Sequence, residues 1–241
     1  MEKLKKIICE DGSETFLNME LGEHYHSTSG ASSEARQKHA HPARLARRSK
    51  ANGGTIRILD FAFGLGYNSA AALEVLLEKN TLPADIEITA LEIDREIILR
   101  IPGMKSDIRH YGIIRDFAEA FRSYSQLIKP FVYKRKNITI RLYLEDALER
   151  IKLLKNNHYD AVFFDPFSSA RVPELWKQEV FDTLFKKLKN GGVLTTYSCA
   201  RHFRNKLGKA GFIWRDVPPG FERRGPSTVA FKRFDPFSGQ Q

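Results

Sequence analysis

The chain has 241 residues, of which 42% are hydrophobic and 28% are charged, and its 39 basic and 29 acidic side chains give a net charge of +10. This composition allows a buried core and excludes disordered, collagen-like and disulfide-stapled proteins. The sequence has no apolar run of about 18 residues and no secretory signal, so we expect a cytoplasmic protein without a membrane partner.

Residues 1–50 are predicted to form an N-terminal extension that packs on a core domain. They mix short polar and aromatic stretches, with no long helical or strand period before EARQKHAHPARLARRS. Cys9 in this extension and the distant Cys199 belong to no CxxC motif and no His/Cys pattern of a zinc site. We therefore expect free thiols and no bound metal.

From Thr55 onward, short buried strands alternate with amphipathic helices. This alternation is typical of right-handed βαβ units, which build a parallel sheet with helices on both faces. We predict that residues 51–241 form one α/β domain of the Rossmann-like, doubly wound type, with an antiparallel edge formed by segments near 212–214 and 227–232. The expected strands are IRILDF, IEITALEI, ITIRLYLED, YDAVFFD and GGVLTTYS, and the expected helices are NSAAALEVLLEKN, 146–155 and 174–189.

Residues 103–137 interrupt this alternation between the second and third strands. The segment is too long for an ordinary connection, so we expect an inserted helical piece. It interleaves basic side chains such as Arg109 and Lys134 with aromatic ones such as Tyr111 and Tyr133. That mixture suits phosphate contact and base stacking, and a cover for the sheet edge is a compatible alternative.

The first strand runs into a glycine-containing turn, Asp60-Phe-Ala-Phe-Gly64-Leu-Gly66-Tyr-Asn68. Open parallel sheets bind ligands where their strands end, and glycine lets the backbone approach a ligand closely. Ser69 stands where the dinucleotide fingerprint has its third glycine, so the turn is not a complete fingerprint. We predict a ligand site at this turn.

Asp60 stands at the end of the first strand and acidic residues follow the next three, so we expect acids at four strand ends. Glu92 is the expected hydrogen-bond acceptor for a ribose diol, and Asp94 is the alternative acceptor. Asp146 either caps the following helix or accepts a hydrogen bond from an adenine amino group. Asp165 has three aromatic residues beside it and precedes Pro166. The alternative to a functional role is that Asp165 is an ordinary turn residue.

A row of acids at the strand ends suits a cationic ligand better than a phosphate-bearing one. Phe63, Leu65 and Tyr67 crowd the turn where a pyrophosphate would need room, and residues 51–99 carry a net charge of −5. S-adenosylmethionine has a sulfonium, an ammonium and a ribose diol. We therefore predict S-adenosylmethionine as the cofactor and neither NAD nor ATP.

The order of motifs then resembles a known family. The motifs are AFGLGYN, LEID, LEDAL, DAVFFDPFSSARVPELW, GGVLTTYS and AGF, preceded by YHSTSGASSEARQKH. They resemble the methyltransferase half of the bacterial bifunctional enzyme that completes 5-methylaminomethyl-(2-thio)uridine at the tRNA wobble position. The likeness runs from about Tyr25 to Val229, and DAVFFDPFSSARVPELW is its most specific part. No flavin-dependent oxidase half is present in these 241 residues, so the resemblance implies a stand-alone methyltransferase without flavin, which we expect to be a monomer.

The resemblance implies a class I methyltransferase fold and gives roles to the matched residues. Asp165 would be catalytic, because a carboxylate can orient a primary amine and take or relay its proton. Phe167 would pack against the methyl donor or a flipped base. The residues matched to the cofactor site are Phe63, Gly64, Gly66, Asn68, Glu92 and Asp146, together with Tyr25.

The positive charge is concentrated in residues 34–50, 100–141 and 197–233, which carry +5, +7 and +7, while the rest of the chain carries −9. Clustered Lys and Arg attract phosphates, although a solvated basic surface is the plain alternative. We predict that the partner is tRNA, bound near its anticodon. The predicted contacts are Arg201, Arg204, Lys206, Arg223 and Arg224, with Arg36, Arg44, Arg47 and Arg48 as a second patch.

These observations predict a tRNA methyltransferase that acts on the amine of 5-aminomethyl-(2-thio)uridine, which other modification enzymes would supply. Two alternatives remain open at this stage. One is a transferase of small amines akin to polyamine synthases, whose fourth-strand region is also rich in aspartate. The other is an RNA-binding module that uses the same fold without catalysis.

Overall fold

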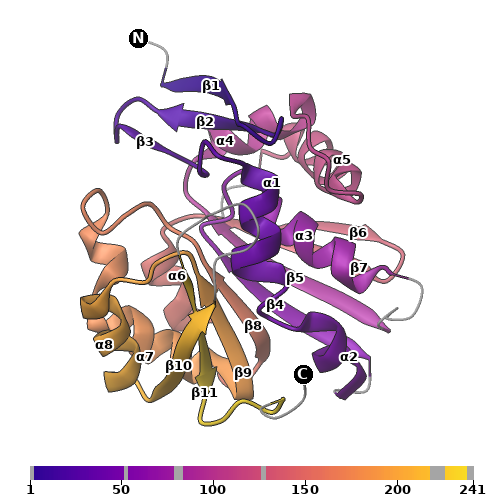
Figure 1. The fold of residues 1–241 in the computed structure, drawn as a ribbon. Helices are drawn as coiled ribbons and strands as arrows, with labels where there is room; N and C mark the ends of the chain where they lie inside the picture. The colour runs from indigo at the N-terminus through magenta and orange to yellow at the C-terminus, as the bar shows by residue number, and fades with distance from the viewer. Residues whose placement is uncertain (1–2, 52–53, 79–83, 126–128, 218–225, 238–241) are drawn as a thin grey trace.

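The computed structural model describes all residues except 1–2, 52–53, 79–83, 126–128, 218–225 and 238–241 (Figure 1). Within these residues, its centre is a sheet of eight strands, of which five are parallel. The parallel strands are β4 (Thr55–Phe61), β5 (Asp85–Glu92), β7 (Ile138–Leu144), β8 (Tyr159–Phe164) and β9 (Leu188–Thr196). The antiparallel ones are β6 (Phe131–Arg135), β10 (Phe212–Val217) and β11 (Ser227–Lys232).

The strand order is β10-β11-β9-β8-β4-β5-β7-β6. The first parallel strand, β4, is central, with β5 on one side and β8 on the other. The strands after β4 are first added on its β5 side and later on its β8 side, so the strand order reverses between the parallel strands β4 and β8. An open α/β sheet binds its ligand at such a point. The predicted fold class, a mostly parallel doubly wound sheet with an antiparallel pair at one edge, is confirmed.

Helices cover both faces of the sheet (Figure 1). Alternate residues of β4 point to different faces, so Ile58 belongs to one hydrophobic core and Leu59 to the other. One face carries α2 (Leu45–Ala51), α3 (Tyr67–Leu76), α4 (Arg95–Arg100) and α5 (Tyr111–Arg122), and the other carries α6 (Ala147–Leu153), α7 (Gln178–Lys187) and α8 (Arg201–Lys209). Short 3₁₀ segments precede α5 at Ile101–Gly103 and α7 at Pro173–Trp176.

The inserted segment 103–137 contains the expected helix and also an unexpected strand. Helix α5 buries Ile114, Phe117 and Phe121. Strand β6 then pairs antiparallel with β7 along the sheet edge. The segment therefore covers an edge of the sheet, as the alternative prediction for residues 103–137 had it.

The N-terminal extension forms a helical segment and a small sheet, and the sequence pattern did not predict the sheet. The sheet contains β1 (Leu4–Ile8), β2 (Glu14–Asn18) and β3 (Glu23–His24), which pair antiparallel in that order. The helical segment combines α1 (Ala31–Glu34) with the π-helix Ala35–Ala40, called η1. Together they lie over the carboxyl ends of the central strands.

Cys9 is buried, Cys199 is exposed, and both are free thiols. Within the described ranges, no set of three or more His, Cys, Asp or Glu side chains is arranged to hold a metal ion. None of the helices in the described part of the chain is both long and apolar enough to cross a membrane.

Candidate active site

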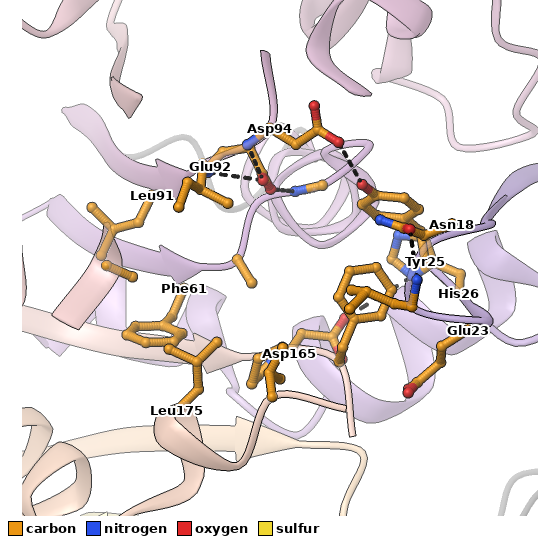
Figure 2. Close-up of a pocket in the computed structure, with 18 of the residues that line it drawn as sticks. Asn18, Glu23, Tyr25, His26, Phe61, Leu91, Glu92, Asp94, Asp165 and Leu175 are labelled. Atoms are coloured by element: carbon orange, nitrogen blue, oxygen red, sulfur yellow. Dashed lines mark hydrogen bonds and ion pairs between the residues drawn. The ribbon is translucent and has the colours of Figure 1, made fainter. Parts of the chain in front are cut away.

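A cavity of about 670 Å³ opens at the carboxyl ends of β4, β5, β7 and β8. Figure 2 shows Phe61, Leu91 and Leu175 along one side of it and Tyr25 and His26 on the opposite side. Tyr25 and His26 come from the N-terminal extension. The extension is therefore a wall of the site and not only a neighbour of the core.

The turn after β4 reaches the cavity at Gly64. Ala62, Gly64 and Gly66 have φ angles of 68°, 52° and 73°, the left-handed region that glycine adopts without a steric penalty. A Cβ atom on Gly64 would lie 3.3 Å from Cδ1 of Tyr25. Glycine at this position therefore lets the turn pass directly under the Tyr25 ring.

Phe63, Gly66 and Asn68, which were predicted as cofactor residues, are not among the residues that line the cavity. The Phe63 ring is buried against Phe117, with their centroids 5.6 Å apart. A Cβ atom on Gly66 would lie 2.7 Å from Cζ of Phe63, so this glycine makes room for the ring. Nδ2 of Asn68 donates a hydrogen bond to Oδ2 of Asp165 at 2.8 Å. These residues lie behind the cavity wall and support it.

Glu92 ends β5, and three backbone N–H groups fix its carboxylate. The N–H of Gly64 donates to Oε2 at 2.8 Å, and those of Ile93 and Asp94 both donate to Oε1 at 2.9 Å. Burial raises the pKa of Glu92 above its usual value, against the effect of these hydrogen bonds. Two carboxylate oxygens offer about four acceptor positions, so capacity for a ligand hydroxyl remains.

Asp94 lines the same part of the cavity and holds Tyr25. Its Oδ1 caps α4 by accepting from the N–H of Glu96 at 2.9 Å. Its Oδ2 accepts from the Tyr25 hydroxyl at 3.2 Å and lies 3.2 Å from Nζ of Lys3. Burial raises the pKa of Tyr25, so this hydroxyl stays protonated and donates. Both Glu92 and Asp94 remain candidates for a ribose diol.

Two further acids of the expected row, Asp146 and Asp60, differ in whether they reach the cavity. Asp146 lines the cavity and caps α6, because its Oδ1 accepts from the N–H of Leu148 at 2.7 Å. Asp60 does not line the cavity: it is fully buried within β4 and accepts from Oγ of Ser69 at 2.6 Å. Burial raises the pKa of Asp60 well above its usual value. Asp60 therefore belongs to the core and does not face the cavity, so counting it in the row of strand-end acids was wrong.

Hydrogen bonds and a ring contact, made by residues of the predicted motif, hold the aromatic segment that follows β8. Nε1 of Trp176 donates to the Phe167 carbonyl at 2.8 Å. The N–H and hydroxyl of Ser168 donate to Glu23 at 2.9 and 2.6 Å. Phe167 lines the cavity, and its ring meets that of Tyr25 edge-on with centroids 4.8 Å apart. The motif thus holds Phe167 rigidly beside the N-terminal wall.

Asp165 opens into the cavity although only 8% of its side chain is exposed. In addition to the bond from Asn68, Oδ1 lies 3.5 Å from Nε2 of His39, and Oδ2 lies 4.0 Å from Nδ1 of His26. Burial alone would raise the pKa of Asp165, but the two histidines and Asn68 outweigh burial and lower it. A carboxylate ionised at neutral pH can pair with a bound ammonium.

His26 and His39 lie beside Asp165, and neither was predicted to have a role. His26 follows β3, and its ring meets that of Tyr67 edge-on, with centroids 5.0 Å apart. His39 is fully buried in η1, with Nδ1 3.2 Å from Oγ1 of Thr195. π-Helical turns are rare and recur at functional sites, and η1 is what directs His39 towards Asp165. Both histidines lie in the YHSTSGASSEARQKH motif, but their spacing in the sequence does not show that both lie beside Asp165.

The three predicted tRNA contacts on α8 differ in whether their cationic groups already have partners within the protein. Arg201 is exposed, whereas Arg204 forms an ion pair with Asp216, and Nζ of Lys206 donates to the Trp176 carbonyl at 2.6 Å. Helix α8 begins only a few residues after Tyr197, which lines the cavity. Arg201 is therefore the freest of the three cations near the site. Arg223 and Arg224 lie outside the described residues.

In the second predicted basic patch, the guanidinium groups of Arg36 and Arg48 already bind other groups of the protein. Arg36 forms ion pairs with Glu74 and Asp107, both at 2.7 Å. Arg48 is only 4% exposed and donates to the carbonyl of Gly191. The assignment of Arg48 to an RNA-binding surface was therefore wrong, and Arg36 has two carboxylate partners already in place.

The composition of the cavity wall fits a cationic cofactor. Among the residues that the structure describes, nine carboxylate side chains line it, against a single lysine, Lys3. Glu92 presents a fixed acceptor beside the backbone of Gly64, and apolar side chains complete the wall. This combination suits a ligand that carries a sulfonium, an ammonium and a ribose diol, as S-adenosylmethionine does.

Comparisons with known proteins agree with this chemistry. Residues 111–233 match a family model described as S-adenosyl-L-methionine-dependent methyltransferase. An uncharacterized protein of Methanocaldococcus jannaschii is 32% identical over 223 residues, which cover 92% of this chain and 58% of that protein. The tRNA 5-methylaminomethyl-2-thiouridine biosynthesis bifunctional protein MnmC of Ralstonia nicotianae is 28% identical over 217 residues, 86% of this chain and 31% of that protein. The chain thus spans only part of both relatives.

Solved structures lead to the same family. The crystal structure of MNMC2 from Aquifex aeolicus matches with a TM-score of 0.78 and 29% identity, covering 97% of this chain and 72% of that one. Spermidine synthase from Thermotoga maritima matches with a TM-score of 0.51 and 13% identity, covering 92% and 69%, and shares the fold alone. From the family match and the acid-lined cavity at the strand ends, we conclude that this chain belongs to the S-adenosylmethionine-dependent methyltransferases and is related to the MnmC proteins.

Proposed function

We propose that this methyltransferase acts on the primary amine of 5-aminomethyl-(2-thio)uridine at the tRNA wobble position and produces 5-methylaminomethyl-(2-thio)uridine. The observation that carries the proposal is the buried carboxylate of Asp165, ionised and open to an acid-lined cavity. An aminomethyl group is a cation at neutral pH, and a buried carboxylate both holds such a cation and competes for its proton. The names of the MnmC relatives support this choice of substrate.

The residues around the cavity divide into two sets in this proposal. When bound, S-adenosylmethionine supplies an electrophilic methyl group. We infer that Gly64, Glu92, Asp146 and Tyr25 hold it, because these four line one cavity and present a close backbone, two carboxylates and a hydroxyl. We infer that Phe167, whose ring lies against that of Tyr25 and whose carbonyl accepts from Trp176, contacts the modified base.

The test is transfer of labelled methyl from S-adenosylmethionine to tRNA that carries 5-aminomethyluridine, followed by nucleoside analysis. We expect the label in 5-methylaminomethyluridine and none in the same tRNA with unmodified uridine at that position. Label in a different nucleoside would overturn the proposed substrate. Equal turnover of a free polyamine without tRNA would favour a small-amine transferase, and tRNA binding without S-adenosylmethionine binding would favour a non-catalytic module.

Arg201 provides a test of the RNA-binding surface. Arg201→Glu should weaken tRNA binding and reduce the slope of log affinity against log salt by about one, because each phosphate contact contributes roughly that amount. The slope can be measured by filter binding between low and physiological salt. Lys186→Glu is the matched control, since Lys186 is exposed on α7 and lies outside the three basic segments. Equal slopes for the two variants would remove Arg201 from the RNA-binding surface.

A further inference from the structure

His26 presents an unpaired nitrogen to the catalytic carboxylate. It lines the cavity, yet only 4% of its side chain is exposed, and Nδ1 has no hydrogen-bond partner among the described residues. This atom lies 4.0 Å from Oδ2 of Asp165 and 3.8 Å from Oε2 of Glu34. Both separations are about 1 Å longer than a hydrogen bond, and such contacts often tighten when substrate binds. A buried nitrogen between two carboxylates is well placed to receive a proton.

The proposed reaction needs such a receiver. An aliphatic ammonium has a pKa of about 10, whereas an ordinary aspartate has one of about 4, so a carboxylate cannot keep the proton that it removes. Burial raises the pKa of Asp165, but its polar neighbours, of which His39 has the largest effect, leave it lower than usual. Asp165 therefore orients the amine well and retains its proton poorly. A base with a pKa nearer to neutral would complete the proton transfer.

We propose that His26 takes up the proton of the substrate amine, acting through Asp165, and that Glu34 is the counter-ion of the resulting imidazolium. This inference rests on the function proposed above. The N–H bond of the ammonium breaks, and its proton passes from Asp165 to Nδ1 of His26. The freed lone pair forms the new N–C bond, while the C–S bond of the methyl donor breaks and leaves its electron pair on sulfur. One ammonium and one sulfonium become one imidazolium and one secondary ammonium, so charge balances.

The surroundings of His26 keep it neutral before the reaction. Burial lowers the pKa of His26, the carboxylates of Asp165 and Glu34 raise it, and the net direction is downward. A neutral imidazole can accept a proton at pH 7, and two nearby carboxylates stabilise it once charged. The groups that face the ring are Asp165 after β8, Glu34 on α1, Lys38 and His39 on η1, and Tyr67 on α3.

The first test is the pH profile of single-turnover methyl transfer in His26→Asn with saturating aminomethyl-tRNA. At pH 7 we expect a rate lower than wild type by about 10²-fold, within the range for general base catalysis. In the variant the rate should rise about tenfold for each pH unit towards the pKa of the amine near 10, because the amine must then lose its proton to solvent. Wild type should instead level off above neutral pH. His158→Asn, at the opposite end of β8, is the matched control and should follow wild type.

A second variant distinguishes proton uptake from a structural role. Glu34→Gln keeps the size of the side chain and removes the negative charge that raises the pKa of His26. The acid limb of its pH profile should therefore move to lower pH, opposite to the change in His26→Asn. A constant fractional loss at every pH in both variants would overturn the role of His26. If wild type transfers no methyl to this tRNA, the proposed function fails instead, so the two failures are distinguishable.

Discussion

Replacing Asp165 by asparagine should lower the rate of methyl transfer by about 10²- to 10⁴-fold, the range that general acid–base catalysis contributes. The amide keeps the volume of the side chain and can still accept the hydrogen bond from Asn68. It carries no charge to hold an ammonium, and it cannot accept a proton in the cavity. The measurement is single-turnover transfer of labelled methyl to aminomethyl-tRNA at saturating concentrations.

Binding measurements separate this loss of chemistry from a loss of structure. The Asp165→Asn variant should bind S-adenosylmethionine and tRNA nearly as wild type does, because the cofactor residues and the basic surface are untouched. Asp182→Asn, on α7 and bonded to Gln178, is the matched control and should transfer methyl normally. A rate close to wild type in Asp165→Asn would contradict the catalytic role.

Replacing Glu92 by glutamine should weaken S-adenosylmethionine binding by about 10- to 100-fold, or roughly 1.4–2.8 kcal/mol. Three backbone N–H groups converge on the two oxygens of this buried carboxylate, from Gly64 on one side and from Ile93 and Asp94 on the other. An amide turns its NH₂ group towards one of these sides, so at least one buried donor loses its partner. Isothermal titration with S-adenosylmethionine measures the change.

Glu87 gives a matched control in the same strand. It lies five positions earlier in β5 and pairs with Arg57 at 3.2 Å, with about a third of its side chain exposed. Glu87→Gln should leave cofactor affinity unchanged, because exposed ion pairs contribute little energy and Glu87 does not line the cavity. Equal affinities in the two glutamine variants would mean that Glu92 does not hold the cofactor.

The sheet could be predicted because its signals are local. Buried parallel strands appear as short apolar runs, and the helices between them show an apolar face, so β4, β5, β7, β8 and β9 followed from periodicity. The antiparallel pair β10 and β11 was also found. Strand β6 was missed because FVYKR alternates without a clear apolar face, and its burial pattern shows no fully buried residue.

The candidate site could be predicted only in part, because motif positions do not show which side chains face inward. Gly64, Glu92, Asp146, Asp165 and Phe167 line the cavity, as does Tyr25. Phe63 belongs to the same turn as Gly64 but points into the core. The histidines were missed for a different reason: their role depends on contacts with residues far along the chain.

Charge clustering along the sequence also proved an imperfect guide to an exposed surface. Arg36 and Arg48 lie in the same basic segment, but one is held by two carboxylates and the other is buried against carbonyl oxygens. A count of charges in sequence does not include the acids that a fold brings to them. Arg201 is exposed at the first turn of α8 and forms no ion pair with the acids in the described part of the chain.

The N-terminal wall of the cavity has a consequence for how the protein matures. Its contacts close very long loops: Glu23 binds Ser168 across 145 positions, and His39 meets Thr195 across 156. During synthesis the first residues leave the ribosome long before these partners exist, and long-range contacts form slowly because loop closure is entropically costly. The cavity is therefore completed late. A nascent chain remains unable to bind its cofactor fully until most of the domain has been translated.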